Sequence, residues 1–374
     1  MSTFNPLRRL PRRLLRSLHS SPRSHAVHNP GAPTLRVFDP HTKYLQKERA
    51  ASNPEASRQV DYLRDEVARR LCERLLYIKR PFPSVLDLGS GPLSIARALT
   101  SPNLDPTTPT SPPITTSHSI TTLTCTDTSP TLLHRDASIP LSTPIETLTL
   151  QPLPSYLPLP FSENTFDLVL SSMALHWIND LPTLLSSILH TLKPDAPFLA
   201  AMLGGDSLYE LRSSLQLSDL ERLGGVTQHI SPLADVRDIG GLLTKAGFTM
   251  LTVDIDDIIV EYPDVFALMA DLQAMGESNA VVQRRKGLMG LSRDVLIATE
   301  AVYRELYGED HESLQGVTKL PATFRIIYMI GWKKGEGQPK PLERGSGEVN
   351  LKEILEGGGG VKGEGEGERE GGRR

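Results

Sequence analysis

The chain has 374 residues, a formal net charge of −4 and 39% apolar side chains. That length suits one large α/β domain with tails, and the charge lacks the basic excess that favours binding to nucleic acid. The two cysteines, Cys72 and Cys125, are too few for a disulfide framework or a cysteine-based metal site. Because no apolar run approaches the ~20 residues of a membrane-spanning helix, we expect any membrane association to be peripheral.

The first 30 residues differ in composition from the rest of the chain. They contain six arginines, frequent serines and no acidic residue. Their leucines fall at helical spacing, which gives one apolar face. This composition is typical of a mitochondrial transit peptide, and we expect residues 1–30 to be one. The alternative is a disordered basic tail.

A predicted helix over 55–77 leads into a short apolar strand, 85–88, and a glycine loop, "DLGSG". Gly89 and Gly91 allow the backbone to approach a ligand closely, and a helix N-terminus that follows offers free N–H groups. Asp87 and Ser90 belong to the same loop. A tight turn without a ligand is the alternative. Leu93 follows at the next small-residue position, where its branched side chain is expected to narrow the site.

The next strand ends at an acid that suits a nucleoside. Residues 100–122 are low in complexity, with 17 Ser, Thr or Pro among 23 residues, and are expected to form a disordered insert. The strand 123–127 then ends at Asp127, where an acid accepts hydrogen bonds from ribose hydroxyls in α/β domains. The insert explains why Asp127 lies 36 residues after Gly91. A surface turn acid is the alternative.

The remaining elements alternate between strands and helices. Apolar runs at 166–170, 197–203, 248–255 and 324–332 predict strands, and helices are expected over 181–192, 206–223, 233–246, 263–275 and 293–307. The order predicts an α/β fold with a parallel, doubly wound sheet. Residues 335–374 are rich in Gly and Glu and are expected to be a disordered tail.

Six further polar residues are candidates for a cleft above the sheet. Ser171 ends a predicted strand, where α/β sheets place chemistry, and His176 follows it closely. The others come from a predicted helix and from a loop between two helices: Tyr209, Arg212, Glu277 and Asn279. The alternatives are a packed structural histidine and solvated faces.

Five strings of sequence together resemble one family. They are "DLGSGPLSIA", "FSENTFDLVLSSMALHWINDLP", "MLGGDSLYELRSSLQLSDLERLGG", "HISPLADVRDIGGLLTKAGFTMLTVD" and "MADLQAMGESNAV". They look like the arginine-hydroxylase assembly factors of mitochondrial respiratory complex I, and the resemblance runs from about residue 37 to 334. It implies a seven-stranded, Rossmann-like class I methyltransferase fold with helical cap insertions.

The resemblance also implies a function. It makes S-adenosylmethionine the cofactor, with Gly89 and Gly91 in the cofactor loop and Asp127 as the ribose-binding acid. From their places in the predicted elements, we expect the other cofactor-binding residues to be Asp87, Ser90 and Ser171. The expected substrate-binding residues are His176, Tyr209, Arg212, Glu277 and Asn279. The implied reaction is hydroxylation of an arginine in a matrix-arm iron–sulfur subunit of complex I, on the matrix side of the inner membrane. The alternatives are a mitochondrial methyltransferase for a small molecule or carrier protein, and a non-catalytic assembly chaperone. No metal site is expected.

Overall fold

The computed structural model describes residues 36–102, 112–282, 291–310 and 318–339. The expected transit peptide, 1–30, lies outside the described residues, and so does the tail beyond residue 339. Within the described part of the chain, no helix is both long and apolar enough to cross a membrane.

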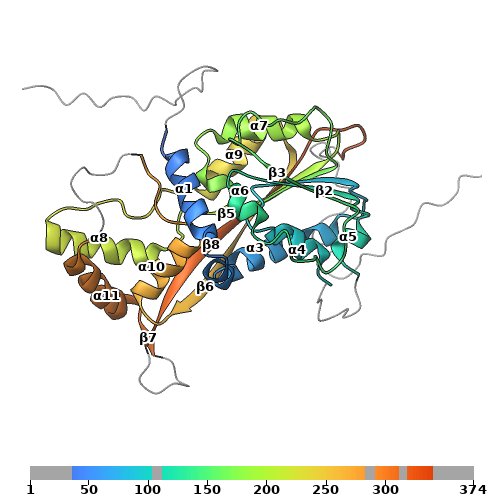
Figure 1. Cartoon of the computed structure of the whole chain (residues 1–374). Helices are drawn as coiled ribbons and strands as arrows, with labels where there is room; N and C mark the ends of the chain where they lie inside the picture. Colours follow the sequence, from blue (N-terminus) through green and yellow to red (C-terminus); the bar gives the residue numbers. More distant parts are fainter. Residues whose placement is uncertain (1–35, 103–111, 283–290, 311–317, 340–374) are drawn as a thin grey trace, which may run out of the picture.

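A mixed β-sheet forms the centre of the molecule (Figure 1). The strands follow the order β3-β2-β1-β4-β5-β8-β6, and a short β7 pairs with β8. Their bounds are β1 Ser84–Leu88, β2 Thr122–Asp127, β3 Thr147–Pro152, β4 Leu168–Ser172, β5 Pro197–Leu203, β6 Thr249–Tyr262, β7 Glu309–Asp310 and β8 Thr318–Trp332.

The first five strands of this sheet are parallel, and β8 and β6 are antiparallel to their neighbours. The predicted parallel, doubly wound sheet is therefore confirmed for five strands, whereas the directions of β8 and β6 differ from it. From β1 the chain first adds β2 and β3 on one side, and then places β4 on the other. This reversal lies between β1 and β4, and α/β sheets bind ligands beyond the carboxyl ends of strands at such a point.

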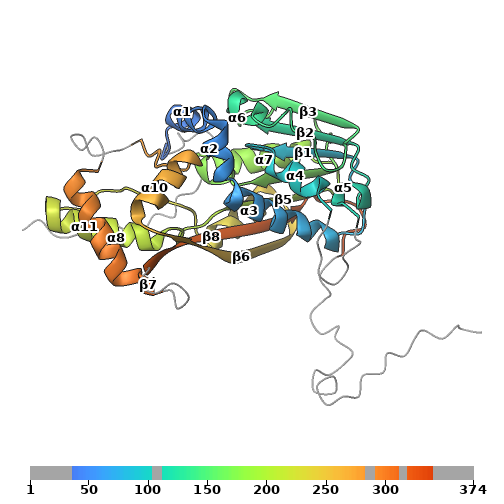
Figure 2. The same cartoon turned by 60° about the horizontal axis from the view of Figure 1, so that its bottom comes forward.

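Helices cover both faces of the sheet (Figure 2). Their bounds are α1 Pro40–Ala51, α2 Pro54–Gln59, α3 Tyr62–Glu73, η1 Arg74–Tyr77, α4 Ser94–Thr100, α5 Ile114–Ser117, α6 Pro130–His134, η2 Leu175–Trp177, α7 Leu181–Thr191, α8 Tyr209–Leu223, α9 Val236–Ala246, α10 Val265–Ala274 and α11 Arg293–Tyr307. The fully buried strand β5 alternates between the faces: Leu199 joins the core under α3 and α4, and Phe198 joins the core under α7 and α9.

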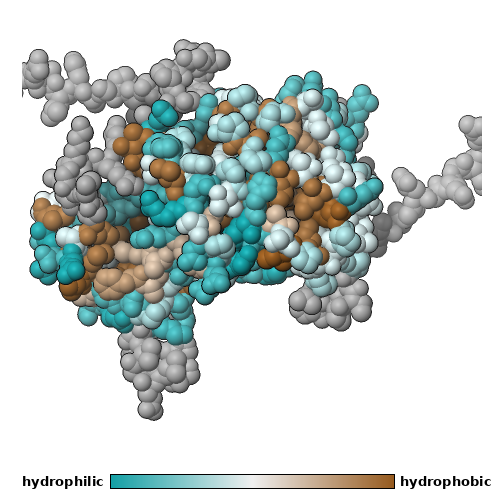
Figure 3. Space-filling view, viewed as in Figure 1, coloured by the Kyte–Doolittle hydropathy of each residue, from teal (hydrophilic) through white to brown (hydrophobic). Residues whose placement is uncertain are grey.

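A helical unit of α8, α10 and α11 lies beside the long ends of β6 and β8 (Figure 1). Its interior contains Leu215 and Tyr303, which are almost completely buried. Its surface carries exposed large apolar side chains, and Figure 3 shows apolar residues gathered over this region. They include Leu217, Leu220, Phe266 and Ile297.

Several predicted elements need correction. The helix expected over 55–77 is divided into α2, α3 and η1, because the chain turns at Val60 and Asp61. The insert expected at 100–122 is not disordered throughout, since its last residues form α5 and the start of β2. Ile114 is buried there and anchors α5 in the core. Sequence patterns also missed α1 and β3.

Candidate functional site

In the loop after β1, the backbone conformation and the close packing at two positions favour glycine. Gly89 has φ +79° and Gly91 has φ +53°, and a Cβ added at Gly89 would overlap the Cβ of Ala174. The amides of Gly89 and Ser90 both donate to the Thr126 carbonyl, at 2.8 Å each. The Ser90 hydroxyl donates to the Asp87 carbonyl at 3.0 Å. The loop is therefore held against the end of β2.

Leu93 does not narrow this site. It has φ 65°, in the left-handed region, and is only 3% exposed. Its side chain belongs to the hydrophobic core shared with α3 and α4, and it is absent from the residues that line the space beside the loop. The expectation from the sequence is wrong because the Leu93 side chain packs in the hydrophobic core.

Leu93→Gly is expected to leave cofactor affinity unchanged within about twofold. The same change should lower the free energy of unfolding by about 2 kcal/mol, because a lost core leucine costs ~2–5 kcal/mol and the relief of the left-handed backbone returns about 1 kcal/mol. Calorimetric titration and urea unfolding measure the two effects. A several-fold gain in affinity would place Leu93 in the site after all.

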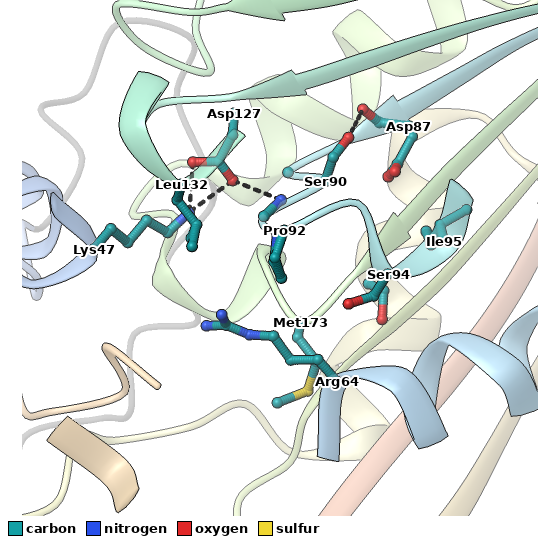
Figure 4. A pocket seen from close by; sticks show the side chains of 13 residues that line it. Lys47, Arg64, Asp87, Ser90, Pro92, Ser94, Ile95, Asp127, Leu132 and Met173 are labelled. Carbon is teal, nitrogen blue, oxygen red and sulfur yellow. Dashed lines mark hydrogen bonds and ion pairs between the residues drawn. The ribbon is translucent and has the colours of Figure 1, made fainter. Parts of the chain in front are cut away.

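Asp87 supplies a buried carboxylate without a partner. Its side chain is fully buried, and neither carboxylate oxygen has a hydrogen-bond partner among the described residues. Burial, together with the nearby negative charge of Asp127, raises the pKa of Asp87 to about 7. The space that it lines is narrow, about 10 Å³, and Arg64 lies across it (Figure 4). An unpaired carboxylate in this position suits a cationic ligand group.

Asp127 lies at the end of β2 and is fully buried. It accepts hydrogen bonds from the amides of Gly91, at 3.1 Å, and Ser129, at 2.8 Å. Lys47 of α1 reaches both of its oxygens at 3.0 Å (Figure 4). Although burial opposes the charge, the Asp127 carboxylate holds the pKa of Lys47 above its usual value.

A second buried cluster surrounds Glu277. Its carboxylate accepts hydrogen bonds from Trp177 Nε1 at 2.7 Å, Arg64 Nη2 at 3.0 Å and His176 Nε2 at 3.2 Å. Lys43 Nζ lies 3.5 Å away, above the Trp177 ring. Burial opposes ionisation of Glu277, but Lys43, His176 and Arg64 hold its pKa well below the usual range. Burial lowers the pKa of His176 and brings that of Lys43 to about 7.

Two larger cavities adjoin the loop. One, of about 710 Å³, lies between α1 and the segments after β2, β3 and β4, and is lined by Lys47, Thr128, Tyr156 and Trp177 among others. The other, of about 210 Å³, is mainly apolar and reaches toward the helical unit. Met173 lines both this apolar cavity and the space beside the glycine loop. The three spaces therefore meet around the carboxyl ends of the strands.

The structure separates the candidate residues into two groups. Asp87, Gly89, Ser90, Gly91 and Asp127 line one space. His176 bonds to Glu277, which lines the apolar cavity together with Asn279.

Three other candidates lie outside these spaces. Ser171 donates to the Leu88 carbonyl at 2.7 Å and joins β4 to β1, whereas its neighbour Ser172 lines the loop space. Tyr209 is exposed and packs against Tyr307. Arg212 donates to the carbonyls of Gly205 and Ser207 and lines a separate polar hollow.

Sequence reasoning missed the cations Lys43, Lys47 and Arg64. The sequence does contain a signal for Lys43 and Lys47, since a spacing of four residues places both on one face of a helix. Asp39 caps that helix and Pro40 opens it. Among the described residues, no group of three His, Cys, Asp or Glu side chains could hold a metal ion.

The sheet order, the glycine loop and the acids at the carboxyl ends of β1 and β2 define the class I methyltransferase fold. The comparisons agree: a family model described as a methyltransferase domain matches residues 60–253. A human protein named "Arginine-hydroxylase NDUFAF5, mitochondrial" is 44% identical over 324 residues, which cover 86% of this chain and 84% of that protein. The zebrafish protein of the same name is 43% identical, covering 86% and 90%.

The chain belongs to this family of NDUFAF5 arginine-hydroxylases with a methyltransferase fold. A more distant relative is the malonyl-[acyl-carrier protein] O-methyltransferase of Gallionella capsiferriformans. It is 35% identical over 175 residues, which cover 47% of this chain and 55% of that protein.

Proposed function

We propose that the chain binds S-adenosylmethionine beside the glycine loop and modifies an arginine of a partner protein. The assignment of this cofactor rests on one observation: the two Asp87 carboxylate oxygens have no partner, and Arg64 lines the same space. The amino-acid part of the cofactor has an ammonium and a carboxylate, which fit these opposite charges. The adjoining cavity of about 710 Å³ has room for the adenosyl part, and Asp127 would accept hydrogen bonds from its ribose once Lys47 moves away.

When bound, S-adenosylmethionine supplies a sulfonium with an electrophilic methyl group. This chain's own residues contribute a fixed site. The loop amides and Asp87 hold the cofactor, Met173 lies at the boundary with the apolar cavity, and the buried Glu277 cluster forms a polar end of that cavity. The aliphatic stem of an arginine suits the apolar walls, and its polar head suits the end where Glu277 and Asn279 lie.

The proposed reaction is hydroxylation, because the relatives that match most of the chain are named arginine-hydroxylases. One C–H bond of the arginine side chain would become C–OH, with the oxygen atom taken from dioxygen. The second oxygen atom would leave as water, with two electrons and two protons from an external reductant. The proposed substrate is an arginine in a matrix-arm iron–sulfur subunit of respiratory complex I. The relatives are named mitochondrial, which supports the matrix side of the inner membrane as the location. Residues 1–30 would then act as the transit peptide, and residues 37–334 as the methyltransferase-like domain.

One other activity has support. The match to a malonyl-[acyl-carrier protein] O-methyltransferase covers about half of this chain and favours carrier-protein methylation as the second candidate.

The test combines binding and product formation with the purified full chain. We expect S-adenosylmethionine to bind in a 1:1 ratio in a calorimetric titration, and malonyl-acyl carrier protein to gain no methyl group when added with it. A methyl ester on the carrier protein would favour the second candidate. No binding heat, with the protein folded, would leave only the non-catalytic chaperone.

A further inference from the structure

The carboxylate of Asp127 has no acceptor position left for a ligand. A carboxylate offers about four lone-pair sites. Two of them receive the amides of Gly91 and Ser129, and the other two receive Lys47 Nζ, which lies 3.0 Å from each oxygen. The side chain of Asp127 is completely buried.

Of these partners, only Lys47 can leave without rebuilding the site. The amides of Gly91 and Ser129 are backbone groups of the two loops that shape the space. Lys47 is a flexible side chain on α1, and it lines both the loop space and the cavity of about 710 Å³. Its ammonium can therefore swing into the larger cavity.

The helix α1 has anchoring contacts that do not involve Lys47. Three hydrogen bonds tie α1 and its N-cap to the segment after α10. The Asp39 amide donates to the Ala280 carbonyl at 2.8 Å, Lys43 Nζ to the Gly276 carbonyl at 2.7 Å, and Gln46 Nε2 to the Asn279 carbonyl at 3.0 Å. The movement is thus confined to the Lys47 side chain.

We propose that Lys47 sets the affinity of the cofactor site, because its ammonium and the ribose hydroxyls of the cofactor compete for the oxygens of Asp127. The inference rests on the proposed function, in which Asp127 holds the ribose. Each binding event breaks the Lys47–Asp127 ion pair, and the lost contact opposes binding. Removal of the lysine ammonium removes that competition.

The experiment is a calorimetric titration of the full chain and its Lys47→Met variant with two probes. S-adenosylmethionine carries a sulfonium charge, and S-adenosylhomocysteine shares its ribose without that charge. We expect Lys47→Met to bind both probes about tenfold more tightly, which is about 1.4 kcal/mol at 25 °C. The matched control is Arg49→Met, which removes an exposed cation from the same helix and should change either affinity by less than about twofold.

A double-mutant cycle separates competition from a change in structure. In an Asp127→Asn background, which lacks the carboxylate, Lys47→Met should no longer change the affinity for S-adenosylhomocysteine. Lys47→Gln keeps a hydrogen-bond donor but removes the charge, and it should shift the affinity in the same direction as Lys47→Met. If Lys47→Met does not fold, Lys47→Gln takes its place in the experiment.

Three outcomes would overturn the inference. Unchanged or weaker binding by folded Lys47→Met would show that Lys47 does not oppose the ribose. A gain for S-adenosylmethionine alone would show simple repulsion of the sulfonium. In both cases the wild-type chain still binds the cofactor, so the proposed function stands. If no variant binds either probe, the proposed function fails together with the inference.

Discussion

Glu277→Ala is expected to lower the free energy of unfolding by about 3–5 kcal/mol, the cost of removing one partner from a buried ion cluster. The change leaves the cations Lys43 and Arg64 without their carboxylate, and both are nearly inaccessible to water. It also removes the acceptor of His176 and Trp177. Urea unfolding followed by tryptophan fluorescence measures the loss.

Glu73→Ala is the matched control for this change. Glu73 pairs with Arg69 on the surface of α3, and its side chain is 39% exposed. Screening by water limits such a pair to less than about 1 kcal/mol. Equal and small losses in the two variants would contradict the view that the Glu277 cluster holds α1 and α3 on the site.

Asp87→Asn is expected to raise stability at neutral pH while it weakens cofactor binding. The pKa of Asp87 is about 7 in the folded protein and 3.8 without the fold. Because this pKa is raised in the folded state, Asp87 contributes its full stabilisation below about pH 4, and that stabilisation is lost as the pH rises to 7. The variant has no titrating group at this position. Its free energy of unfolding relative to wild type should therefore increase by about 4 kcal/mol between pH 4 and 8.

The cofactor affinity of the wild-type chain should change with pH in the opposite direction to its stability. Ionised Asp87 pairs with the ammonium of S-adenosylmethionine, so wild-type affinity should rise about tenfold from pH 5.5 to 6.5. Asp87→Asn should show no such rise and should bind about 10–100-fold more weakly at pH 7.5, as expected for a lost charged hydrogen bond. Parallel pH profiles of the two proteins would contradict the placement of the ammonium at Asp87.

The sequence was a good guide to elements with strong periodicity and clear ends. The predicted strand 123–127 and the observed strand β2 both end at Asp127, and α11 has the predicted bounds. α9 ends before Gly247, whose φ of 102° only glycine adopts readily. The antiparallel strands were not predictable, because apolar alternation is the same for both strand directions.

The site was harder to predict than the fold because its electrostatics depend on distant pairs. Asp127 was identified from its place at a strand end, but its partner Lys47 lies 80 residues earlier on a helix with little apolar pattern. The direction of Leu93 depends on a left-handed backbone that glycine would ordinarily supply. Glu277 and His176 are 101 residues apart in the sequence, and only the fold brings their side chains to 3.2 Å.

We propose that this chain adds oxygen to an arginine of a matrix-arm iron–sulfur subunit of complex I. Mass spectrometry of that subunit, from cells with and without this protein, is the decisive measurement. We expect one arginine peptide to carry the mass of an extra oxygen atom in wild-type cells and to lack it in cells without the protein. An oxygen-bearing arginine that persists without the protein, or a lost methyl group in its place, would rule out arginine hydroxylation by this chain.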